Sequence, residues 1–151
     1  MALPSSNPVS FTPATGNFEV DTITIGTTTT EVAGTIDLDL GFVVSGKVSI
    51  PEWLPGGGTS TGQVCVYADE LGGPFNDSIG CTTVDFTAPT VVTDPPGMLT
   101  VSWSISVDNS SGLPDPQPGA SQLYHLAAVF TYGPQTTDIA AFVDLGMYMI
   151  N

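Results

Sequence analysis

The chain has 151 residues, which suits one domain with a sizeable core, and its 41% hydrophobic residues exclude general disorder. Its 15 Asp and Glu residues face one Lys and no Arg, so the formal net charge is −14. This charge repels phosphate groups and thereby excludes nucleic acids and anionic membrane surfaces as partners.

The beginning of the chain is rich in Pro, Ser, Thr and Asn. This composition predicts an extended N-terminal arm over residues 1–17, either flexible or laid on a neighbouring subunit. The main apolar anchors of the arm are Leu3, Val9 and Phe11. We expect residues 18–151 to form a single β-sandwich domain.

From Thr35 to Ile50 the sequence alternates between apolar and polar positions, which predicts a strand with one buried and one solvated face. The even positions are all apolar or glycine: Ile36, Leu38, Leu40, Phe42, Val44, Gly46, Val48 and Ile50. The run is longer than a typical strand of about 5–6 residues. We therefore expect a bulge or bend at Ser45-Gly46, where the strand passes from one sheet to another.

Other strands are expected where β-branched and aromatic residues are bounded by turns rich in Gly, Pro and Asp. They are Phe18–Ile25, Gln63–Ala68, Cys81–Phe86, Leu99–Val107, Leu123–Tyr132 and Ile139–Ile150. Seven or eight strands without an amphipathic helix indicate an all-β fold. The expected architecture is an antiparallel β-sandwich of the immunoglobulin-like or jelly-roll kind.

The last two predicted strands, 123–132 and 139–150, are apolar on nearly both faces. A surface strand of a lone sandwich needs only one apolar face, so these strands require a second cover. That cover is either another part of the chain or another subunit, and we expect a homo-oligomer, with a trimer as the first choice. The interface candidates in these strands are Tyr124, Leu126, Phe130, Tyr132, Phe142 and Tyr148.

Cys65 and Cys81 lie on adjacent predicted strands. A hairpin between these strands could bring them together, and a disulfide would stabilise the fold by about 3 kcal/mol in the chain-entropy model. A protein folded in a reducing cytoplasm more often keeps such residues as small buried thiols. We expect two free thiols.

The single histidine, His125, lies in one of the apolar strands. A Ser-His-Asp site needs a His that a third group presents at a pocket, and no GxSxG elbow accompanies this one. Metal sites that use several His or Cys ligands are excluded by the count of these residues. We expect a structural role for His125 and a protein without catalytic residues.

Two acidic clusters could supply the oxygen ligands that calcium requires. The candidates are Asp69, Glu70, Asn76 and Asp77 in one cluster and Asp108, Asn109 and Asp115 in the other. Neither cluster matches the EF-hand pattern, and acidic residues in such loops are usually turn formers. We expect no cofactor, with calcium as the alternative.

The two tryptophans bear on carbohydrate binding. Trp103 occupies an inward position of its predicted strand and is expected in the core. Trp53 lies between two prolines near a run of glycines, where it either fills a gap in the packing or is exposed for stacking on a sugar ring. If Trp53 is exposed, a carbohydrate-binding module is an alternative function.

Three segments carry a resemblance: MALPSSNPVSFTPATGNFEV, GQVCVYADELGGPFNDSIGCTTVDF and YHLAAVFTYGPQTTDIAAFVDLGMYMIN. In general character, though not through a shared motif, the chain resembles small virion proteins of tailed bacteriophages: head-decoration or cement proteins and tail accessories. The resemblance implies an assembly role, either clamping capsomers or presenting an outer surface. The implied partners are the major capsid protein or other virion proteins.

The start Met1-Ala2-Leu3-Pro4 has neither the basic region nor the apolar stretch of a signal peptide. The expected location is therefore a virion made in the host cytoplasm, or the extracellular space if the chain is a mature secreted form. The alternative function is an extracellular carbohydrate-binding or adhesion module of the pilus-like kind. A hydrolase is the third interpretation.

Overall fold

The computed structural model describes residues 9–11, 16–25, 35–36, 41–51, 61–87, 97–108, 110, 122–132 and 139–150. These residues form nine strands and no helix, and seven of the strands have ten residues or more. The all-β fold expected from the sequence is confirmed. Within the same ranges there is accordingly no helix long and apolar enough to cross a membrane.

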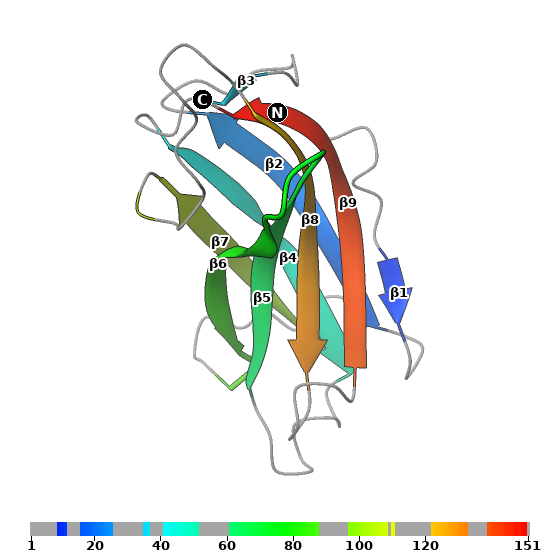
Figure 1. The fold of residues 1–151 in the computed structure, drawn as a ribbon. Coiled ribbons are helices and arrows are strands. Elements are labelled where there is room, and N and C mark those ends of the chain that lie inside the picture. Colours follow the sequence, from blue (N-terminus) through cyan, green and yellow to red (C-terminus); the bar gives the residue numbers. More distant parts are fainter. Residues whose placement is uncertain are drawn as a thin grey trace.

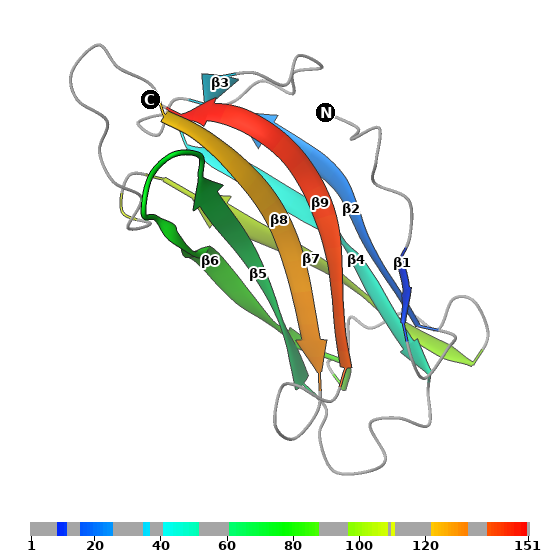
Figure 2. The same cartoon turned by 45° about the vertical axis from the view of Figure 1, so that its right-hand side comes forward.

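The strands are β1 (Val9–Phe11), β2 (Gly16–Ile25), β3 (Thr35–Ile36), β4 (Phe42–Pro51), β5 (Thr61–Glu70), β6 (Asn76–Asp85), β7 (Met98–Val107), β8 (Gln122–Tyr132) and β9 (Ile139–Ile150). They form two sheets, with strand orders β1-β2-β4-β7 and β3-β9-β8-β5-β6 (Figure 1). In Figure 2, β8 and β9 lie in front of β4 and β7, so the two sheets are the layers of a sandwich. Among the described strands, the pairings are antiparallel except that β3 runs parallel to β9.

The order of the long strands follows the immunoglobulin-like arrangement. The first, second and fifth long strands, β2, β4 and β7, share one sheet, and the third, sixth and seventh, β5, β8 and β9, share the other. These sets correspond to the A-B-E and C-F-G strands of immunoglobulin domains. The fourth long strand, β6, pairs with β5 rather than with β7, so the sheet that contains β8 and β9 is the larger one.

The predicted Thr35–Ile50 strand is divided between the two sheets. β3 pairs with β9, whereas β4 pairs with β2 and β7. The change of sheet therefore lies before β4, and the expectation that it lies at Ser45-Gly46 is wrong. A bulge does occur beside Gly46, but it belongs to the partner strand, between Val20 and Thr22 of β2.

Gly46 allows the bulged strand and an aromatic ring to approach β4 closely. A Cβ at this position would lie 2.0 Å from the carbonyl oxygen of Glu19 and 2.9 Å from Cζ2 of Trp103. Trp103, directly opposite Gly46 on β7, stacks on Phe18 with ring centroids 5.6 Å apart. Phe18 in turn stacks on Phe130 of the other sheet, at 5.8 Å. This row of rings joins the two layers, and it includes the Trp103 that we expected in the core.

Part of the predicted N-terminal arm belongs to the sandwich. Val9–Phe11 forms β1, which pairs with β2 at the edge of its sheet and also contacts β9. β2 begins at Gly16, slightly before the predicted domain boundary at residue 18. The short strand β1 therefore closes one side of the sandwich, between an edge of each sheet.

Candidate functional site

The outer faces of the two sheets differ in polarity. On β4 and β7 the outward positions hold mostly hydroxyl groups: Val43, Ser45, Lys47, Ser49, Thr100, Ser102, Ser104 and Ser106. The exposed large hydrophobic residues of the described chain all belong to the other sheet or to its β5–β6 turn: Tyr67, Leu71, Phe142 and Met147. The candidate functional site is therefore the outer face of the five-stranded sheet.

Strand register brings these side chains together from separate parts of the chain. Phe142 of β9 lies opposite Val129 of β8, and β8 in turn pairs with β5, which carries Tyr67. Leu71 follows in the β5–β6 turn, whose backbone is held to the start of β8 by a hydrogen bond. We define the apolar face by five side chains: Tyr67, Leu71, Val129, Phe142 and Met147. Phe142 is the most exposed of them, at 64%.

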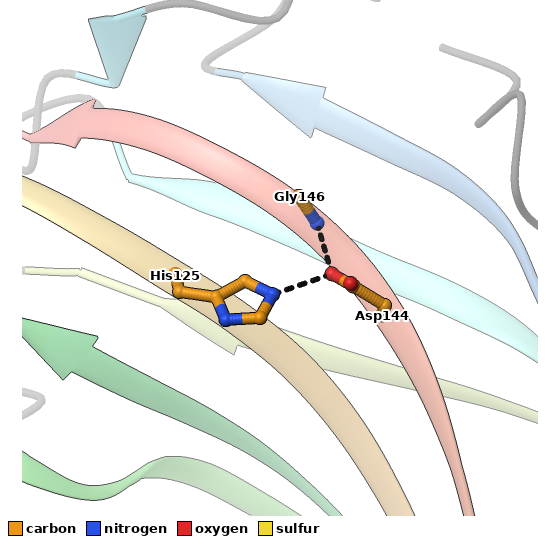
Figure 3. Close-up of polar contacts among 3 residues, drawn as sticks. All are labelled: His125, Asp144 and Gly146. Atoms are coloured by element: carbon orange, nitrogen blue, oxygen red, sulfur yellow. Dashed lines mark hydrogen bonds and ion pairs between the residues drawn. The ribbon is translucent and has the colours of Figure 1, made fainter.

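A bulge in β9 determines which residues reach the apolar face. The register with β8 shifts between Asp144 and Gly146, so that Leu145 is an inserted residue. Gly146 has a φ of +92°, which residues with a side chain rarely adopt, and its N–H donates to Oδ1 of Asp144 at 2.8 Å (Figure 3). Because one residue is inserted, the alternation changes phase, and Met147 points outward while Tyr148 is buried.

The apolar face has a polar pair in its middle, formed by His125 and Asp144 (Figure 3). Nε2 of His125 lies 2.6 Å from the Asp144 oxygen that also accepts from Gly146. The hydrogen bond from His125 and then that from the Gly146 N–H hold the pKa of the Asp144 carboxyl below its usual value. Asp144 is therefore ionised at neutral pH and accepts the bond that His125 donates. This use of Nε2 orients the pair on the surface.

Cys65 and Cys81 form a disulfide between β5 and the edge strand β6. The two residues lie directly opposite each other, with their Cα atoms 4.1 Å apart. The expectation of two free thiols is wrong, because the strand register places both side chains on the same face of neighbouring strands. Cys65 also lies opposite Val129 of β8, so the disulfide borders the apolar face.

Most interface candidates from the last two strands point inward. Five of them are buried between the sheets of their own chain, each at 4% exposure or less: Tyr124, Leu126, Phe130, Tyr132 and Tyr148. These side chains form the core and are not accessible to a partner. Phe142 is the candidate that faces outward. Leu3 lies outside the described residues, as do the side chains of Val9 and Phe11.

The first group of calcium candidates is divided between two faces of the β5–β6 hairpin. Asp69 lies opposite Asn76, whereas Asp77 lies opposite a buried position of β5. The carboxylate of Glu70 accepts a long hydrogen bond from the backbone N–H of Phe75 in the turn, at 3.4 Å. In the part of the chain that the structure describes, no three His, Cys, Asp or Glu residues are grouped so that they could hold a metal ion.

The second group of calcium candidates is only partly described. Asp108 accepts a hydrogen bond from the backbone N–H of Ser110 at 2.9 Å, and bonds from Ser110 lower the pKa of its carboxyl. Asp108 thus acts as a turn former. Asn109 and Asp115 lie outside the described residues, as does Trp53.

Sequence reasoning missed four residues of the apolar face: Tyr67, Leu71, Val129 and Met147. Tyr67 could have been found by following the outward positions of its strand. Met147 could not, because uninterrupted alternation from Ile139 assigns it to the buried face and assigns Tyr148 to the outside. Only the bulge at Asp144–Gly146 reverses this assignment, and its position depends on the pairing with β8.

No protein-family model, curated protein or solved structure matches this chain. The functional assignment therefore rests on the fold, the apolar face and the disulfide.

Proposed function

We propose that the protein is a non-enzymatic assembly protein that docks on a larger protein partner through its apolar face. The observation that carries this proposal is the concentration of exposed Tyr67, Leu71, Phe142 and Met147 on one sheet, while the outward positions of β4 and β7 in the other sheet mostly present hydroxyl groups. Scattered apolar residues on a surface need no explanation, but contiguous ones mark interaction sites. Aromatic and Met side chains are also those enriched at protein interfaces.

The whole outer face of the five-stranded sheet, which contains the apolar face, is large enough for a protein partner. Four long strands spaced about 4.8 Å apart, with about ten residues rising about 3.3 Å each, cover about 600 Å² in projection. A standard protein interface buries about 800 Å² per partner. Docking on this face therefore needs only a modest additional contribution from neighbouring loops.

The face is held rigidly, which lowers the entropy that docking costs. β5 and β8 are interior strands paired on both sides, and the disulfide fixes edge strand β6 to β5. The core side chains of β8 and β9 pack against the opposite sheet from beneath. A partner would thus meet a preformed surface.

The proposed assembly is a virus particle, as the resemblance to bacteriophage decoration proteins suggests. The Cys65–Cys81 disulfide is compatible with this location, because disulfides persist on virion surfaces and in other oxidising environments. The proposed partner is accordingly the capsid protein or another virion protein.

The disulfide also favours a second candidate, an extracellular binding or adhesion module, because such domains fold under oxidising conditions. A glycan array separates the two functions. Specific retention on defined glycans, abolished by a substitution on the apolar face, would favour the adhesion module over the virion protein.

The direct test is co-sedimentation of the purified protein with virus particles from its own source. Wild type and Val43→Ser should migrate with the particles, whereas Phe142→Ser should stay in the soluble fraction with an unchanged far-UV circular dichroism spectrum. Val43 is the control because it is a partly exposed apolar residue on the outer face of the opposite sheet. Failure of the wild-type protein to sediment with any particle would overturn the assembly role.

A further inference from the structure

We infer that the partner of the apolar face is a different protein whose docking surface places Arg or Lys among apolar side chains, and not a second copy of this chain. The inference rests on the proposed docking function and specifies the chemistry of the partner. It is carried by the distribution of charge around the five apolar side chains.

Carboxylates, and no Lys or Arg, share the outer face with the apolar side chains in the described residues. Asp144 lies on β9 between Phe142 and Met147, and Asp69 of β5 lies opposite His125 in the register. Asp85 stands at the far end of β6, opposite the first residue of β5. The one Lys of the chain, Lys47, is exposed on β4 of the other sheet. A partner that covers this face therefore meets negative charge only, apart from His125 when it is protonated.

A neutral partner surface would displace the water that hydrates these carboxylates and would offer no hydrogen bonds in its place. This loss disfavours association. A partner that places guanidinium or ammonium groups against them replaces the lost water with charge-assisted hydrogen bonds. Arg is especially suitable because its planar fork binds a carboxylate through two parallel bonds while its stem packs on apolar neighbours. The apolar side chains then supply affinity, and the charged contacts among them supply orientation and a faster association rate.

A second copy does not meet these requirements. In a two-fold contact the same patch meets itself, so each copy would bring Asp69, Asp85 and Asp144 to the interface, while the one Lys of the chain lies on the other sheet. Each copy also carries a formal net charge of −14. Salt at about 0.15 M screens charges beyond about 8 Å but leaves groups in direct contact repelling each other.

The test uses three synthetic β-hairpin peptides of equal length and the full-length protein labelled with ¹⁵N. The first peptide has Leu, Phe and Arg interspersed on one face, the second has Glu in place of Arg, and the third has Ser in place of Leu and Phe. Titration is followed by amide chemical shifts. The first peptide should shift amides of β5, β8 and β9 and bind at least about tenfold more tightly than either of the others.

Matched variants locate the binding site. Asp69→Asn and Val129→Ser should weaken binding of the Arg and Leu/Phe peptide severalfold. Asp21→Asn and Val43→Ser, which make the same changes on strands of the opposite sheet, should leave it unchanged. Raising the salt concentration should weaken this binding, because the contacts between Arg and the carboxylates are screened.

Four results would overturn the inference. Equal affinity for the Arg and Glu peptides would show that the partner needs no cationic groups, and equal affinity for the Ser peptide would show that it needs no apolar side chains. Absence of binding by all three, or light scattering that shows a dimer abolished by Val129→Ser and not by Val43→Ser, would also overturn it. The particle co-sedimentation test remains separate, so docking on particles without peptide discrimination would defeat this inference and leave the proposed function standing.

Discussion

Asp144 on β9 accepts a hydrogen bond from Nε2 of His125 on β8, over 2.6 Å, between the apolar side chains of the outer face. The pair exists because the Gly146 bulge turns the Asp144 side chain toward the neighbouring strand and fixes it through the Gly146 N–H. An exposed pair of this kind contributes little to stability. Asp144 lies between Phe142 and Met147, so the pair instead gives the proposed docking face a polar group of fixed orientation.

The bond between His125 and Asp144 should affect how the stability of the protein depends on pH. The pKa of the Asp144 carboxyl is lowered in the folded state by the bonds from His125 and Gly146. A group with a lowered folded pKa stabilises the fold above its unfolded pKa of about 4, and this contribution is lost as the pH falls through the folded value. Urea unfolding between about pH 5 and pH 2 should therefore show a steeper loss for wild type than for Asp144→Asn. Parallel curves would contradict the assigned bonds.

The disulfide should be a major contributor to stability. It closes a loop with a sequence separation of 16 residues, for which the chain-entropy model gives about 3 kcal/mol. The double variant Cys65→Ala/Cys81→Ala should lose about that amount in urea unfolding, and reduction of the wild type with dithiothreitol should give a similar loss. Unchanged unfolding midpoints in both experiments would mean that the two cysteines are not paired.

Gly46 should tolerate no side chain. A methyl group there would lie 2.0 Å from the carbonyl oxygen of Glu19, so the bulge of β2 or the Trp103 ring must move. We expect Gly46→Ala to destabilise the protein by about 1–3 kcal/mol or more. Ser104→Ala, at an exposed position of β7 in the same sheet, should stay within about 0.5 kcal/mol of wild type. Equal stabilities of the two variants would contradict the close approach.

The hydroxyl groups of two core tyrosines should not contribute to the stability of the protein. Tyr124 and Tyr148 lie opposite each other on β8 and β9, and their buried hydroxyl oxygens have no hydrogen-bond partner in the described part of the chain. Tyr148→Phe and Tyr124→Phe should therefore leave stability unchanged or raise it by about 1–3 kcal/mol, the cost of an unsatisfied buried polar group. Tyr124→Ala should instead cost about 3–5 kcal/mol, because it removes the packed ring. A clear loss in either Phe variant would reveal a hydrogen bond.

Much of the fold follows from local patterns in the sequence. The alternation over Leu99–Val107 predicts β7 almost to the residue, and the apolar run over Ile139–Ile150 predicts β9 with its observed bounds. The inward Trp103 is likewise confirmed. These features are predictable because each depends only on the pattern of apolar residues within one segment.

The parts that sequence did not predict depend on pairing between segments. Cys65 meets Cys81 only in the observed β5–β6 register. Met147 and Tyr148 exchange faces because of a bulge that is defined relative to β8. The sequence does show that both faces of β8 and β9 are largely apolar. Which of their apolar side chains face outward depends on the register with the neighbouring strands.

Hydroxyl-radical footprinting tests most directly whether the apolar face is the surface buried in the assembly. Free protein and particle-bound protein are oxidised in parallel, and peptide mass spectrometry gives the oxidation rate at each reactive side chain. Exposed Met147, Phe142 and Tyr67 should be oxidised readily in the free protein and at least about fivefold more slowly when bound, as expected for side chains buried at an interface. Unchanged oxidation of Met147 and Phe142 in bound protein, with protection of Val43 on the opposite sheet, would contradict the account.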